Sequence, residues 1–243
     1  MRTLVCVKRV PETGARITLT ADAQAIDTAY LGFTISPHEE CAVEEAVRIG
    51  GETTVLTLGP RAAEEQLRNA IAMGIQDALL LETDGGDWSA EATAAAIADA
   101  VRGTGYDLLL FGNESADTGN YQVAVRVAYA LGLPVVTGIK GLEILDGAVR
   151  ARREAGGGWE IFELPLPAVV SVKEGINLPR YPSLQGRLRS KKTPIERHLP
   201  EPRSSGLEKI RLVVPQEERR SAELLPDAAG VVAVLRELGL VAS

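Results

Sequence analysis

The sequence is poor in the residues that build metal centres and disulfide frameworks. It has two cysteines and two histidines among 243 residues. Cys6 and Cys41 lie in apolar stretches, and neither His38 nor His198 has a second histidine or cysteine at metal-ligand spacing. We therefore expect no metal site, no disulfide framework, and two buried, reduced thiols.

Aromatic residues and positive charge are also scarce. Aromatic side chains make up 4% of the chain, and the formal net charge is −7. Single-stranded nucleic acid is bound by stacking on aromatic rings, and duplexes are bound by neutralising phosphates with lysine and arginine. We predict that this protein has no nucleic-acid partner.

Long apolar runs are missing too. A helix that crosses a bilayer needs about 20 consecutive apolar residues, and no run in this sequence approaches that length. The apolar stretch at residues 2–8 is typical of a short strand and is too short for the core of a signal peptide. These absences predict a cytoplasmic protein without membrane insertion.

Several catalytic signatures are absent. The sequence has no G-x-S-x-G elbow, no phosphate-binding G-x-x-x-x-G-K-[ST], and no G-x-G-x-x-G after its first strand. Neither histidine belongs to an obvious acid–base or nucleophile motif in the sequence. We predict no catalytic residues, which disfavours a hydrolase on this scaffold.

What the first 140 residues do contain is an alternation of apolar strands and amphipathic helices. This pattern predicts a parallel sheet sandwiched by helices, a Rossmann-like α/β fold of the adenine nucleotide alpha hydrolase-like type. The fully apolar run at 108–111 is expected to be central, and residues 17–28 form an irregular excursion that resembles a hairpin. We expect strands at 4–7, 53–58, 78–81, 108–111 and one beginning at 133–136, and helices at 36–50, 89–101 and 121–131, with a further helix that starts after Pro60 and runs through Ile71.

The pattern changes after about residue 138. Short apolar stretches at 142–145, 149–153, 159–163 and 168–172 are separated by glycine-rich turns, which predicts a small antiparallel section. Residues 177–226 then show no periodicity, hold seven prolines, and are rich in lysine and arginine. We interpret this stretch as an extended C-terminal arm that contacts an acidic partner surface, followed by a terminal helix at 228–238. The expected division is therefore 1–176 for the α/β domain and 177–243 for the arm.

A ligand of such a sheet is expected beyond the carboxyl ends of its strands, near helix N-termini. The polar segment 112–122 follows the predicted central strand and precedes a helix. Its small residues would let backbone N–H groups approach a phosphate. A capped loop without a ligand is the alternative, since aspartate and threonine also cap helices.

Six motifs in order resemble the beta subunit of electron transfer flavoproteins. They are V-K-R-V-P at 7–11, S-P-H-E-E-C-A-V-E-E-A at 36–46, L-G-P at 58–60, A-I-A-M-G at 70–74, a signature stretch at 153–171, and P-R-Y-P-S-L at 179–184. The resemblance runs from Met1 to about Glu196.

The resemblance implies an electron carrier instead of a stand-alone enzyme. Members of this family pair with an alpha subunit that holds most of an FAD, and the beta subunit binds AMP or, in electron-bifurcating relatives, a second FAD. Carried over by position, the nucleotide contacts are Cys6, Val7, Lys8, Ser36, Leu58, Gly59, Asn113, Asp117, Gly119, Asn120 and Gln122.

The resemblance also implies redox partners. An acyl-CoA or related dehydrogenase would donate electrons, and a quinone reductase would accept them. Leu184 corresponds to the apolar anchor that binds the dehydrogenase. The full set of expected partner contacts is Tyr181, Ser183, Leu184, Arg187 and Arg189.

The sequence departs from the family pattern at several positions. Ser36 replaces an asparagine, His38 and Glu39 replace Phe-Asp, and Asn120 replaces a threonine. The spacing from Asp117 to the next proline resembles the shorter loop of bifurcating homologues, in which a second flavin near Arg9 and Glu12 would oxidise NADH. AMP and a second FAD therefore both stay open. A rival from another class is a universal-stress-type nucleotide-sensing module, which predicts a homodimer, ATP binding and no flavin.

Overall fold

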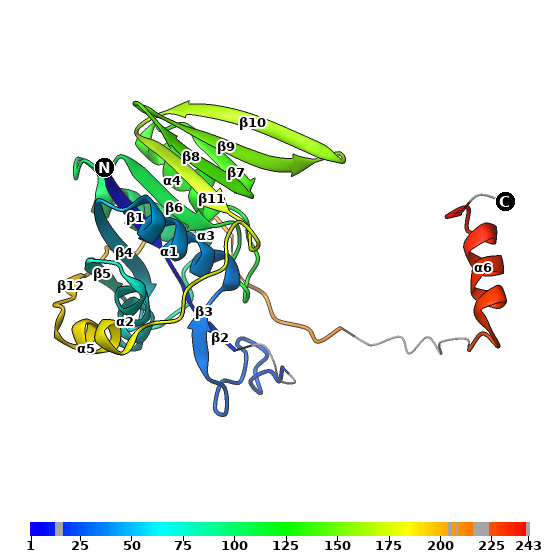
Figure 1. The fold of residues 1–243 in the computed structure, drawn as a ribbon. Coiled ribbons are helices and arrows are strands. Elements are labelled where there is room, and N and C mark those ends of the chain that lie inside the picture. The colour runs from blue at the N-terminus through cyan, green and yellow to red at the C-terminus, as the bar shows by residue number, and fades with distance from the viewer. Residues whose placement is uncertain (13–16, 204–205, 208, 216–223, 242–243) are drawn as a thin grey trace.

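The computed structural model describes residues 1–12, 17–203, 206–207, 209–215 and 224–241. Its main feature is a seven-stranded sheet in the order β12-β5-β4-β1-β6-β11-β7, in which every neighbouring pair is parallel (Figure 1). The strands are β1 (Arg2–Cys6), β4 (Glu52–Gly59), β5 (Asp77–Glu82), β6 (Leu108–Gly112), β7 (Val135–Ile139), β11 (Ala168–Val172) and β12 (Glu196–His198). The predicted α/β class is confirmed, and β6 is an interior strand as expected.

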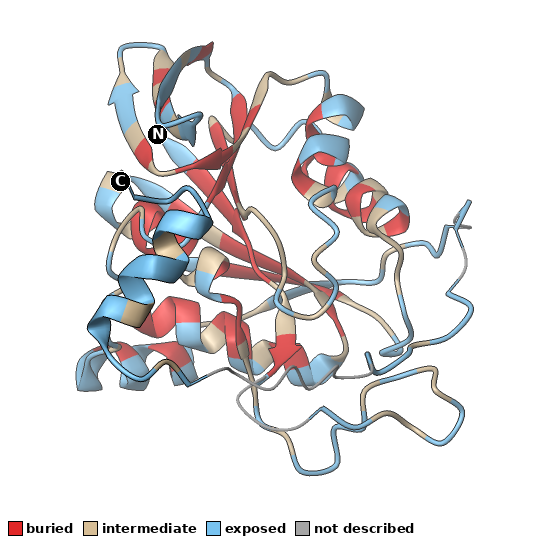
Figure 2. Ribbon diagram, turned by 90° about the vertical axis from the view of Figure 1, so that its right-hand side faces the viewer, coloured by how far each residue is buried: buried red, intermediate tan, exposed pale blue. Residues whose placement is uncertain are grey.

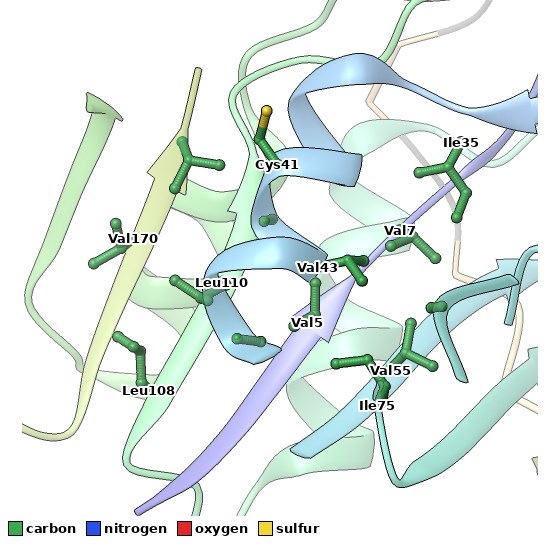
Figure 3. Close-up of a cluster of buried hydrophobic side chains, with 14 of the residues drawn as sticks. Val5, Val7, Ile35, Cys41, Val43, Val55, Ile75, Leu108, Leu110 and Val170 are labelled. Atoms are coloured by element: carbon green, nitrogen blue, oxygen red, sulfur yellow. The ribbon is translucent and has the colours of Figure 1, made fainter. Parts of the chain in front are cut away.

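Helices cover both faces of this sheet. On one face, α1 (Pro37–Ile49) and α2 (Glu64–Met73) pack on a cluster that includes Val5, Val55 and Leu110 (Figure 3). On the other face, α3 (Ala90–Val101) and α4 (Val123–Leu131) pack on a second cluster around Leu4 and Leu109. Strands buried on both faces must be apolar throughout, and Figure 2 shows the buried residues concentrated in the sheet and the inner sides of the helices.

The helix ends follow signals in the sequence. Ser36 is the N-cap residue of α1, with Pro37 in its first turn, and Ser89 caps α3 by accepting a hydrogen bond from the Ala92 N–H at 3.1 Å. Gly132 ends α4 in a left-handed conformation. A short 3-10 turn, η1 (Arg61–Ala63), precedes α2.

The small antiparallel section has three strands: β8 (Gly141–Leu145), β9 (Ala148–Ala155) and β10 (Gly158–Pro165). The prediction that 168–172 belongs to it is wrong, because this stretch forms β11 inside the main sheet, between β6 and β7. All five residues of β11 are buried. A continuous apolar run of this kind suits a doubly covered parallel strand better than a strand with one face in water.

The prediction that 177–226 lacks regular structure is also wrong in part. Helix α5 (Leu184–Lys192) packs on α2, and β12 extends the main sheet beside β5. Neither element carries the apolar periodicity that sequence patterns depend on. Leu184 and Leu188 of α5 are exposed, and β12 consists of three exposed polar residues.

The basic residues of the arm contact this chain's own acidic surface. Four of them form ion pairs with the α/β domain, which corrects the expectation that the arm as a whole meets an acidic partner: Arg180 with Glu44, Arg197 with Glu64, Arg203 with Asp99, and Lys209 with Asp87. Further along, the Leu212 N–H donates to the Ala23 carbonyl at 2.8 Å. These four cations of the arm are therefore paired within the chain.

Two peripheral features complete the fold. β2 (Arg9–Pro11) and β3 (Phe33–Ile35) form a two-stranded antiparallel ribbon, and a bridge between Leu19 and Ile26 confirms the hairpin-like excursion. The terminal helix α6 (Ala228–Glu237) stands apart from the α/β domain (Figure 1). Within the part of the chain that the structure covers, no helix is both long enough and apolar enough to traverse a bilayer.

Candidate nucleotide-binding site

Three segments meet beyond the carboxyl ends of β1 and β6. Lys8 follows β1, Ser36 precedes α1, and the segment 113–122 connects β6 to α4. The Lys8 Nζ lies 2.6 Å from the Asp117 Oδ2, and the Ala116 N–H donates to the Ser36 Oγ at 3.1 Å. The first turns of α1 and α4 both face this end of the sheet, which is where an α/β sheet binds its ligands.

Glu39 lies at the centre of this arrangement. Its side chain is 7% exposed, and its Oε2 accepts hydrogen bonds from the Lys8 N–H at 2.9 Å and the Ser36 N–H at 3.4 Å. Burial raises the pKa of this carboxyl to about 8, against the opposing effect of the two N–H groups and the Lys8 ammonium. Burial therefore favours the protonated form of the Glu39 carboxyl.

A glycine makes this burial possible. A Cβ on Gly112 would lie 2.6 Å from the Glu39 Cγ and 3.0 Å from the Glu39 backbone nitrogen. Only a residue without a side chain lets the end of β6 come this close to the first turn of α1.

The charges of the site are balanced in pairs. Burial alone would raise the pKa of Asp117, but the nearby Lys8 ammonium, with hydrogen bonds from Ser115 and Thr118, outweighs burial and lowers it. Asp117 is therefore anionic and neutralised by Lys8. Burial raises the pKa of the Cys6 thiol well above its usual value, and the adjacent Glu39 adds to this effect. Cys6 is accordingly an inert, neutral thiol.

The remaining expected contacts surround this core unequally. Val7 is buried in the apolar cluster below the site, where Figure 3 also shows Ile35, so only its backbone could reach a ligand. The Asn113 side chain is held by the Ser171 hydroxyl, which donates to its Oδ1 at 3.2 Å. Leu58 and Gly59 end β4, one strand beyond β1.

The last three expected contacts lie on the far part of the connecting segment. Gly119 adopts a φ of 53°, a left-handed conformation that suits glycine. Asn120 is exposed, and the Gln122 Oε1 accepts a hydrogen bond from the Arg126 Nε at 3.0 Å. The structure thus brings together Cys6, Lys8, Ser36 and Asp117, and leaves Asn120 and Gln122 directed elsewhere.

The donors present fit a phosphate-bearing nucleotide. The Lys8 side chain is partly exposed, so its ammonium can approach a ligand, and the N-terminus of α4 presents backbone N–H groups nearby. Among the residues that the structure covers, no group of three or more His, Cys, Asp or Glu side chains could hold a metal ion. The arrangement is suited to binding an anion and has no nucleophile–base pair for bond-breaking chemistry.

The expected partner contacts on and before α5 fall into two groups. Tyr181 and Leu184 are 95% and 75% exposed, and Arg187 is also exposed. Ser183 and Arg189 have roles within the chain: the Ser183 Oγ caps α5 by accepting from the Gly186 N–H, and the Arg189 Nη2 donates to the Ile71 carbonyl at 2.6 Å.

The contacts expected from the sequence do not include Glu39, and the predicted segment 112–122 gives no role to Gly112 in making room for that carboxyl. The spacing of Ser36 and Glu39 is that of a capping box, S-x-x-E, and this signal could have identified the Glu39 carboxyl as a group that turns back toward the N-cap. No local signal marks Gly112, because its role depends on a helix that is distant in sequence.

Comparison with known proteins places the chain in a family. The electron transfer flavoprotein domain matches residues 25–202. The electron transfer flavoprotein subunit beta of Syntrophomonas wolfei is 38% identical over 80% of this chain and 78% of its own length. The proteins of the same name from Bacillus subtilis and Dictyostelium discoideum are 35% and 31% identical, over 81% and 83% of this chain and 78% and 82% of their own lengths. With its parallel sheet and its site at the strand ends, the chain therefore belongs to the electron transfer flavoprotein beta subunit family.

Proposed function

We propose that this chain binds AMP at the carboxyl ends of β1 and β6 and joins an alpha subunit that holds most of an FAD, so that the heterodimer carries electrons between a dehydrogenase and an acceptor. The observation that carries the proposal is the convergence of Lys8, Ser36 and the segment 113–122 on one spot in a chain of this family.

The chain's own residues account for nucleotide binding. The Lys8 ammonium and the N–H groups at the start of α4 would hold the phosphate, and the Lys8–Asp117 pair fixes the connecting segment in place. AMP bound here has no chemical step to undergo. It stabilises the folded state because it binds only that state.

Helix α6 supports the pairing with an alpha subunit. Its apolar side chains remain accessible, and no residue of the helix is buried. An apolar helix face without a covering element is typical of a protein–protein contact. The exposed apolar residues are Val231, Val232 and Val234 on α6 and Leu238, Leu240 and Val241 directly after it. The flavin of the alpha subunit, when bound, supplies the redox chemistry, and the protein around it supplies orientation and shielding.

Helix α5 supports the docking of a dehydrogenase such as an acyl-CoA dehydrogenase. Leu184 projects from its first turn, and the exposed cations Arg187, Lys191 and Lys192 follow on the same helix. The three cations would attract an acidic partner surface toward this helix. Leu184 would then insert into an apolar pocket of that partner. A quinone reductase, as the electron acceptor, would dock on the same exposed region of α5.

A second candidate is the bifurcating type, in which a second FAD replaces AMP and NADH is oxidised. One observation favours it: the Arg9 Nε is buried without a hydrogen-bond partner among the described residues, and its guanidinium lies 3.2 Å from the centre of the Phe33 ring. A buried donor without an acceptor is uncommon and suggests a polar ligand.

Co-expression with the alpha subunit and a count of bound cofactors test the proposal. We expect a yellow heterodimer with one FAD and one AMP and no oxidation of NADH. Two FAD per heterodimer together with NADH oxidation would establish the bifurcating type instead. A colourless homodimer that binds ATP would support the universal-stress-type module and overturn both.

A further inference from the structure

We propose that Glu39 is a positioning residue that couples nucleotide binding to proton uptake: the site binds a nucleotide phosphate more tightly when the Glu39 carboxyl is protonated than when that carboxyl is ionised. This inference rests on the proposed function and deepens it, because it names how the site is regulated.

The geometry places Glu39 between the two residues that hold the site together. Its Oε2 accepts from the backbone N–H of Lys8, whose ammonium binds Asp117, and from the backbone N–H of Ser36, whose hydroxyl binds the Ala116 N–H. The carboxyl thus binds the backbones of the two residues whose side chains contact the segment 113–122. A change in its charge acts on both links at once.

The surroundings single out Glu39 as the group that titrates near neutral pH. The Cys6 thiol faces it from β1 and has a strongly raised pKa, so it stays neutral. Asp117 faces it from the segment 113–122 and has a lowered pKa, so it stays anionic. Lys8 is the cation nearest to both carboxyls, and His38 and Glu40 flank Glu39 on α1 itself.

The sign of the coupling follows from like charges. Asp117 already raises the pKa of Glu39, and a phosphate bound beside Lys8 would add further negative charge. The nucleotide complex therefore has a higher Glu39 pKa than the free protein. Binding above the free pKa of about 8 must then take up a proton, and the affinity must fall as the pH rises through that value.

The test measures AMP binding by calorimetry at pH 7, 8 and 9, with the full chain as wild type and as Glu39→Gln. We expect the wild-type affinity to fall by about threefold to tenfold between pH 7 and 9. Repeating each titration in two buffers of different ionisation enthalpy counts the protons, and we expect uptake at pH 8 and 9. The affinity of the Glu39→Gln variant for AMP should change by less than about twofold between pH 7 and pH 9. Its binding should be accompanied by no proton uptake.

Glu40→Gln is the matched control. Glu40 is the next residue on α1, and burial and Glu174 raise its pKa, but its carboxyl takes no part in the links from Lys8 and Ser36. This variant should keep the wild-type dependence on pH. An equal loss of pH dependence in both variants would contradict the assignment to Glu39.

Stability gives a readout that needs no nucleotide. The pKa of Glu39 is raised in the folded state, so wild type should lose stability as the pH rises from about 4.5 to about 8, and Glu39→Gln should not. If wild type binds AMP with the same affinity at all three pH values, this inference is wrong and the proposed site stands. If wild type binds neither AMP nor FAD at any pH, both are overturned.

Discussion

Glu44 shows how one buried carboxylate joins two distant parts of this chain. It lies on α1 and is 3% exposed, and it accepts hydrogen bonds from the Arg180 Nε at 2.8 Å and the Arg48 Nε at 2.7 Å. Burial alone would raise its pKa, but the hydrogen bonds from the two arginines outweigh burial and lower the pKa to about 2. The first residues of the arm are therefore fixed to α1 by charge.

Glu44→Gln is expected to lower the free energy of unfolding by roughly 2–4 kcal/mol at pH 7, because Arg180 loses its charged partner. A carboxyl whose pKa is lowered by folding contributes stability above its unfolded pKa of about 4.3 and loses it as the pH falls toward 2. Urea unfolding should therefore show that the free energy of unfolding differs less between pH 7 and pH 3 in the variant than in wild type.

Glu52→Gln is the control for this prediction. Glu52 pairs with Arg2 at 3.0 Å, but both side chains are exposed, so we expect a change of less than about 0.5 kcal/mol. Equal losses in the two variants would mean that burial is not what makes the Glu44 network strong.

At the scale of elements, α5 depends on close packing and not on an apolar stripe. Its Gly186 is buried against α2, where an added Cβ would lie 2.2 Å from the Ala72 carbonyl oxygen. Arg189 then hydrogen-bonds to α2 one turn further on. The polar helix α5 is thus held on α2 by a glycine contact and a charged donor.

Gly186→Ala should separate α5 from α2, because a backbone oxygen cannot move aside as a flexible side chain can. We expect a loss of about 1–3 kcal/mol in overall stability and faster amide hydrogen exchange across residues 184–198. Gln185→Ala, at an exposed position of the same helix, should exchange as wild type does. Unchanged protection in Gly186→Ala would show that α5 is fixed by other contacts.

At the scale of the whole molecule, the α/β domain and α6 have separate tasks. The sheet and its four covering helices form two apolar clusters, and no residue of α6 belongs to either. We therefore expect the domain to be stable without α6, which packs on neither cluster.

Removing residues 216–243 should consequently leave the thermal midpoint of the isolated chain within about 2 °C of the full chain. The same truncation should weaken binding to the alpha subunit by at least about tenfold, since several exposed apolar side chains would be lost from the contact. Differential scanning calorimetry and a titration of the alpha subunit measure the two effects. A truncated chain that unfolds early would place α6 in the core of this molecule instead.

The sequence by itself determined the α/β class and the start of α1 and α3, and it predicted the segments that form the candidate site. These features are local: an apolar run predicts a buried strand, and Ser36 and Ser89 supply caps to the residues that follow them. The carboxyl ends of parallel strands lie at one edge of the sheet. The sequence therefore also predicted that Lys8 and Asp117, which follow two of these strands, lie at the same edge.

Only the tertiary structure decided which strands are neighbours and which carboxyls are buried. The apolar run of β11 is compatible with a doubly covered parallel strand, but its position between β6 and β7 is set by strands that are distant in sequence. The exposed polar strand β12 gains its pairing from β5 alone. Glu39 becomes a buried acid because Gly112 leaves room for it, and a pattern of neighbouring residues cannot express a contact between segments that meet only after folding.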